Sequence, residues 1–185
     1  PVWTGAGSTT QQAEMSPGAS TMSVFADYST EEQQLLLRSL QAAAVAISAA
    51  SPGRKVETVS EGFAAASFIM ERNAAQLENT LIGSVQFALD ERAKTGQPFP
   101  DYVKVATAQD AGPQALDALR QVAALLAAKS TPAEADGYKQ WLLEIAARTT
   151  EAGKEGGNFF GRGAVLVNDA EKAALQEIAT ALSLA

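Results

Sequence analysis

Apolar side chains recur every three or four residues through most of this chain, and that spacing places them on one face of an α-helix. The first such series follows Ser29, and others begin near residues 56, 77, 116, 138 and 175. Many alanines lie among them and allow helices to approach closely. The sequence therefore predicts an all-α fold, a bundle of five to six amphipathic helices around one core. The inward positions of its first, fourth, fifth and last helices are Leu36, Leu40, Ala43, Ile47, Leu116, Leu119, Ala123, Leu126, Tyr138, Trp141, Leu142, Ile145, Ala152, Leu175, Ile178 and Leu182.

Helix starts are indicated by three capping boxes, in which a short polar side chain and an acid three residues later satisfy the first free amides. They begin at Ser29, Thr131 and Asn168. We expect another helix to start at Gly112-Pro113, because proline in the first turn forgoes no hydrogen bond. Glycine and proline at 51–53 and at 95–100 indicate helix ends.

The region between these ends contains two further apolar series, Val56, Val59, Phe63, Ala66 and Met70, then Leu77, Leu81, Val85 and Leu89. No glycine or proline separates them, so they form either two helices, with Asn73 near the junction, or one bent rod. The alternating segment 102–107 and the apolar segment 164–167 could also pair as a two-stranded ribbon beside the bundle.

The chain has 185 residues, the size of one domain. Residues 1–28 are rich in polar residues and glycine and read as an extended N-terminal arm, leaving 29–185 as a single helical domain. Trp3, Phe25 and Tyr28 lie in this arm, where we expect no local core for an aromatic ring. They are therefore candidate contacts for a partner.

Histidine and cysteine are both absent, which excludes the usual zinc sites, Ser-His and Cys-His nucleophile pairs, and thiolate-held clusters. No cofactor is expected, and no catalytic residue can be proposed. Disulfides are also excluded, which leans the expected localisation toward the cytoplasm.

The net charge is −7, and the 14 lysines and arginines are scattered rather than gathered on one face. Nucleic acid and anionic membrane surfaces are therefore not expected partners. The longest apolar run, residues 42–50, is half the length that a membrane span requires.

One stretch departs from the helical pattern, residues 151–165 with the sequence EAGKEGGNFFGRGAV. Its glycines expose backbone amides that could ring an anion, but the residues and their order match neither the P-loop nor the dinucleotide-binding pattern. A structured turn fits better, with Gly153 or Gly156 closing the preceding helix in the left-handed conformation. The candidate ligand-binding residues of this loop are Gly156, Gly157, Asn158, Gly161, Arg162 and Gly163.

A family resemblance covers residues 138–184, which contain the motifs KQWLL, KEGG, GRG and an Ala-Glu helix. This segment is similar to the C-terminal part of uncharacterised bacterial helical proteins, a group that implies no activity. More remotely it resembles one hairpin of TerB-like tellurite-resistance domains, and that resemblance implies metal binding through acidic loop residues. The present loop departs from the pattern, with Asn158 and Arg162 where carboxylates would be needed.

Pairs of carboxylates at helical spacing occur at Glu71 and Glu78, at Glu144 and Glu151, and at Asp90-Glu91. Such pairs can bind a divalent cation or transfer protons, but nearby arginines make ion pairing on a solvated helix face the better reading. The expected function is that of a non-catalytic soluble protein working through protein contacts, as an accessory subunit or an oligomer. The alternative is a small-molecule, anion or divalent-metal binder that uses the loop 153–167.

Overall fold

A computed structural model describes residues 22–50, 67–71, 73–98, 108–155 and 169–184. In these residues the chain forms six α-helices and no strand, so the predicted all-α fold is confirmed. The elements are η1 Phe25–Asp27, α1 Thr30–Ala49, η2 Ser67–Met70, α3 Ala74–Glu78, α4 Thr80–Lys94, α5 Ala108–Lys129, α6 Pro132–Glu155 and α7 Asp169–Ala181.

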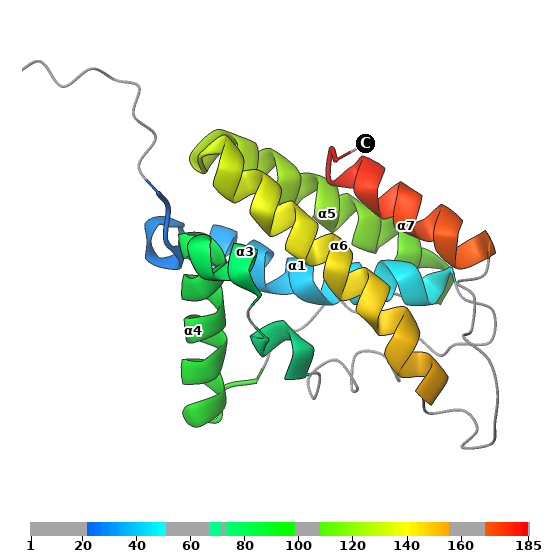
Figure 1. The fold of residues 1–185 in the computed structure, drawn as a ribbon, viewed down its shortest axis with the longest axis horizontal. Coiled ribbons are helices and arrows are strands. Elements are labelled where there is room, and N and C mark those ends of the chain that lie inside the picture. Colours follow the sequence, from blue (N-terminus) through cyan, green and yellow to red (C-terminus); the bar gives the residue numbers. More distant parts are fainter. Residues whose placement is uncertain (1–21, 51–66, 72, 99–107, 156–168, 185) are drawn as a thin grey trace, which may run out of the picture.

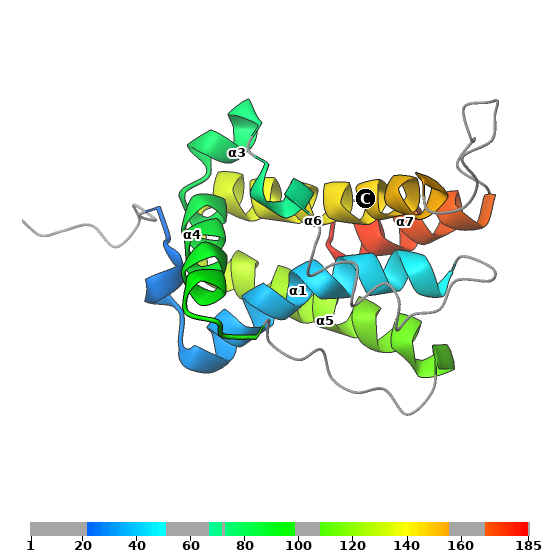
Figure 2. The same ribbon diagram turned by 90° about the horizontal axis from the view of Figure 1, so that it is seen from below.

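The long helices α1, α5, α6 and α7 run along the molecule, and α4 stands across one end of them (Figures 1 and 2). α1 is the central helix, in contact with α5, α6 and α7. The short helix α3 and the segment η1 lie beside α4 at the same end. The molecule is thus a four-helix body with a smaller layer at one end.

α1 is buried all round rather than on one face. Every position from Leu36 to Ser48 is buried except Arg38, because helices cover this rod on several sides. Its alanines let those helices approach closely. Tyr138 of α6 is fully buried beside it and donates its hydroxyl to the carbonyl oxygen of Leu36 over 3.0 Å, and burial raises the pKa of this hydroxyl.

Two of the predicted capping boxes are formed as expected. The Ser29 amide donates to Glu32 over 2.7 Å and the Glu32 amide donates to the Ser29 hydroxyl over 3.3 Å. Thr131 and Glu134 make the same pair of bonds at the start of α6. α7 begins at Asp169, directly after the predicted cap Asn168, which itself lies outside the described residues.

The predicted start of the fourth helix at Gly112-Pro113 was wrong. α5 already begins at Ala108, and Pro113 lies inside it. The extra turn packs against the end of α1, where Ala111 is fully buried and a Cβ on Gly112 would stand 3.3 Å from the Cβ of Ala49. This burial outweighs the helical hydrogen bond that proline cannot make.

The region between Ser67 and Lys94 is neither one rod nor two simple helices. Asn73 caps α3 and Asn79 caps α4, each by accepting a backbone amide on its side chain. The chain changes direction at Asn79, so Leu77 does not share a face with the buried Leu81 and Val85. The spacing predicts that Leu77 points inward, but its side chain is 64% exposed. The positions Val56, Val59, Phe63 and Ala66 of the preceding series lie outside the described residues, and Met70 ends η2 with its side chain exposed.

The remaining inward positions of α5, α6 and α7 are buried, apart from Leu116 and Leu175, which are half-buried, and Ala152, whose side chain is not described. α6 continues through Gly153 to Glu155, so Gly153 does not close it. Both halves of the predicted ribbon, 102–107 and 164–167, lie outside the described residues.

Candidate functional site

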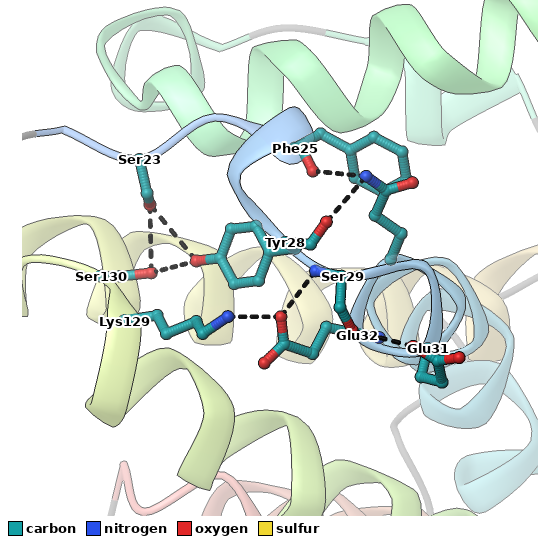
Figure 3. A network of polar contacts seen from close by, with 9 residues as sticks. Ser23, Phe25, Tyr28, Ser29, Glu31, Glu32, Lys129 and Ser130 are labelled. Atoms are coloured by element: carbon teal, nitrogen blue, oxygen red, sulfur yellow. Dashed lines mark hydrogen bonds and ion pairs between the residues drawn. The ribbon is translucent and has the colours of Figure 1, made fainter.

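Residues 22–28 are fastened to the helical body by a buried hydroxyl cluster (Figure 3). Tyr28 is only 4% exposed, and its hydroxyl lies 2.7 Å from the Ser130 hydroxyl and 3.3 Å from that of Ser23. Ser23 and Ser130 are themselves 3.3 Å apart and buried. All three hydroxyls bond one another, so the cluster holds residues 22–28 against the helical body.

The carboxylate of Glu134 also holds residues 22–28 against the helical body. Glu134 is 3% exposed and accepts the Ser23 amide over 2.9 Å on one oxygen and 3.2 Å on the other. It also accepts the amide and hydroxyl of Thr131, its partner in the capping box. One buried carboxylate thus starts α6 and holds a segment 111 residues earlier in the chain.

Lys129 closes the cluster at its solvent side. Its ammonium lies 5.6 Å from the centre of the Tyr28 ring and pairs with Glu32 of the first capping box. The hydrogen bond from Lys129 lowers the pKa of the Glu32 carboxyl. Gln33 adds two bonds from its amide to the carbonyl oxygens of Phe25 and Tyr28.

The expectation that the aromatic residues of the arm have no core of their own was wrong for Tyr28, which belongs to the protein's core. Phe25 is half-buried against that core, and its amide donates to Ser84 of α4 over 2.8 Å. Residues 22–28 therefore pack as part of the helical body. Trp3 lies outside the described residues, and its role as a partner contact stays a prediction.

Replacing Tyr28 with phenylalanine separates its structural role from a role in partner binding. Tyr28→Phe removes one hydroxyl and leaves the buried Ser23 and Ser130 hydroxyls with fewer partners, so we expect a loss of about 1 to 2 kcal/mol in the free energy of unfolding. Urea unfolding measures this loss. An unchanged unfolding midpoint would contradict the structural role.

The large apolar side chains that do face solvent lie on α4 and on the segments next to it. Among the described side chains, the large exposed apolar ones are Met22, Met70, Leu77 and Phe87. Met22 lies against Thr80, the first residue of α4, with 3.6 Å between its sulfur and the threonine hydroxyl. Phe87, two turns further along the same face, is 63% exposed. We call this face, made by Met22, Thr80, Gly83 and Phe87, the outer α4 surface.

A small cavity of about 150 Å³ lies between η2, α3 and α6, over Trp141 and Ile145. Arg148 spans its mouth, 2.6 Å from Glu71 and 3.2 Å from Glu144, and these contacts raise the pKa of Arg148. The second oxygen of Glu144 accepts the side chain of Gln76. Glu71 and Glu144, which the sequence spacing paired with Glu78 and Glu151, thus lie on either side of one arginine, while Asp90 and Glu91 both pair with Lys94 of their own helix.

These polar groups fasten η2 and α3 onto α6. In the part of the chain that the structure describes, no group of three or more histidine, cysteine or acidic side chains is placed to hold a metal ion. No described helix is long and apolar enough to cross a membrane.

The glycine-rich loop residues Gly156, Gly157, Asn158, Gly161, Arg162 and Gly163 lie outside the described residues. Their role in ligand binding stays a prediction. Comparison of the chain with family models, with curated proteins and with solved structures gave no match. The resemblance of residues 138–184 to uncharacterised bacterial proteins and to TerB-like domains therefore also stays a prediction.

Sequence reasoning missed the outer α4 surface, although a signal was present. Phe87 does not fall on the stripe formed by Leu81, Val85 and Leu89, so a helix through these residues must turn its ring away from the core. The two asparagines also indicated breaks, because asparagine is among the preferred N-caps.

Proposed function

We propose that this chain is a non-catalytic helical protein that works through protein-protein contacts, as an accessory subunit or an oligomer, and that the outer α4 surface is its contact site. One observation carries the proposal. The exposed large apolar side chains of the described chain all lie on α4 or on segments next to it, while the described side chains of α1, α5, α6 and α7 add none. Two of them, Met22 and Phe87, belong to the outer α4 surface, and exposed apolar residues that share one face of a folded protein are typical of a binding surface.

The chemistry of the chain supports a binding role over a catalytic one. It has no histidine or cysteine from which to build a nucleophile-base pair. The polar clusters at Glu134 and Arg148 are internally bonded and hold elements together. Phe87, by contrast, is largely exposed to solvent. Aromatic residues are enriched among those that dominate binding energy.

Phe87→Gln tests the proposal. We expect it to remove most of any protein that co-purifies with the tagged full chain from its native source, or to abolish self-association of the pure chain. A central aromatic side chain contributes about 2 kcal/mol or more to an interface. The thermal midpoint should stay the same, because the ring packs little in the isolated chain.

Gln114→Ala, at an exposed position of α5, is the matched control and should keep every contact. The proposal fails if Phe87→Gln and Gln114→Ala behave alike. A truncation that tests the arm should remove residues 1–21 only, since a longer cut removes the Ser23 amide that Glu134 holds.

A further inference from the structure

Residues that follow one another at alternating steps of three and four along α4 lie on one face of the helix. The opposite face is buried through Leu81, Ile82, Val85 and Gln86. At 3.6 residues per turn, the repeating positions form a stripe that points away from the body. Its members are Thr80, Gly83, Phe87, Asp90 and Lys94, of which Gly83 and Asp90 are half-buried and the others exposed.

This stripe contains a projecting side chain and, one turn away, the hollow left where Gly83 has no side chain. The ring of Phe87 projects into solvent, and a Cβ added to Gly83 would meet nothing within 4 Å. If two α4 helices lie antiparallel with a two-fold axis level with Val85, the Phe87 ring of each copy rests over Gly83 of the other. Such reciprocal fit is what a two-fold interface requires, because each patch must complement itself.

The charges along α4 favour antiparallel over parallel pairing. Asp90 and Glu91 lie toward the C-terminal end of α4, where both pair with Lys94. Antiparallel pairing keeps these charged clusters of the two copies at opposite ends of the helix pair, away from each other. Parallel pairing would instead set Phe87 against Phe87 and Asp90 against Asp90.

We propose that the partner of the outer α4 surface is a second copy of this chain, bound antiparallel with each Phe87 over the other copy's Gly83. This inference rests on the proposed function and names its partner. One helix pair is a small interface beside the roughly 1,600 Å² of a standard one, so we expect a weak, concentration-dependent dimer.

Sedimentation equilibrium of the full chain, from about 5 μM to about 1 mM, measures the dissociation constant of this dimer. We expect a monomer-dimer equilibrium that Phe87→Ala weakens by a factor of about 10 or more. Gly83→Gln should weaken it similarly by filling the hollow, yet raise the thermal midpoint by about 2 °C, since glutamine favours a helix and has room in the monomer. Gln114→Ala should change neither.

Cross-linking tests the register, because the chain has no cysteine of its own. Antiparallel pairing about Val85 sets residue 80 of one copy opposite residue 90 of the other. A mixture of Thr80→Cys and Asp90→Cys chains should therefore give covalent dimers with a short thiol-specific linker. Either variant alone should not, since its two thiols would be separated by about 15 Å along the helices.

A monomer at all concentrations overturns this inference. A dimer that either Phe87→Ala or Gly83→Gln leaves unchanged overturns it as well. Cross-linking within single variants would also overturn it. If the pure chain is monomeric but Phe87→Gln still releases a different co-purifying protein, the proposed function stands and only the second copy is excluded. If Phe87→Gln releases nothing and the chain is monomeric, both fail.

Discussion

Glu134→Ala is expected to lower the free energy of unfolding by about 3 kcal/mol, the largest effect among the polar positions considered. The substitution removes the capping box of α6, typically about 1 kcal/mol. It also leaves the buried Ser23 amide without its acceptor, and hydrogen bonds to a charged group contribute about 1.5 to 3 kcal/mol. Urea unfolding followed by far-UV circular dichroism measures the loss.

Asp136→Ala provides the matched control two positions further along α6. Asp136 is itself exposed but pairs over 3.5 Å with the buried Lys139, so its removal should cost about 1 kcal/mol, well below the loss at Glu134. Glu134→Gln keeps one acceptor oxygen and should fall between the two. Equal midpoints for Glu134→Ala and Asp136→Ala would show that the buried carboxylate does not hold residues 22–28.

Gly137→Ala is expected to destabilise the protein by about 2 kcal/mol, although alanine is the better helix former. A Cβ at position 137 would stand 2.5 Å from the side-chain nitrogen of Asn79. That nitrogen donates to the carbonyl oxygen of Glu134 over 3.0 Å, while the side-chain oxygen caps α4 by accepting the Ile82 amide over 3.1 Å. Asn79 is only 6% exposed, so moving it breaks both bonds, each about 1 kcal/mol, and shifts α4 against α6.

The same substitution at Gly83 is the control, because its Cβ would meet nothing within 4 Å. Gly83→Ala should stabilise the monomer by about 0.5 to 1 kcal/mol in the helix interior. The cause of the difference can be checked in an Asn79→Ala background, where Gly137→Ala should lose its penalty since the two groups no longer collide. A penalty that persists there would place the conflict elsewhere.

Both predictions concern one corner of the molecule. Glu134 holds residues 22–28 through its carboxylate and α4 through its carbonyl oxygen. Met22 and α4 together make the outer α4 surface, so the start of α6 positions both sides of the proposed contact site. A change at Glu134 or Gly137 should therefore weaken association as well as stability, whereas Phe87→Gln should affect association alone.

Much of the fold could be read from local sequence signals. The capping boxes at Ser29 and Thr131 start their helices where predicted, because a cap is satisfied within one turn and needs no distant partner. The inward residues of α1, α5, α6 and α7 were also largely identified, since a period of 3.6 residues fixes which side chains share a face. The all-α class follows from these two signals together.

Other features depended on neighbours that are distant in sequence. α5 starts before Pro113 because Ala111 and Gly112 pack on the end of α1. Leu77 is exposed because Asn79, bonded to the backbone of α6, turns the chain there. Neither outcome is visible in local spacing.

The sequence by itself determined the class of fold, most helix faces and the chemistry that the chain lacks, because each depends on residue type and short spacing. Only the tertiary structure decided that Tyr28 is a core residue, that Glu134 joins segments 111 residues apart, and that Phe87 is exposed one turn from Gly83, where an added side chain would meet open space. These depend on which helices meet across long sequence separations, and burial is settled only by that packing.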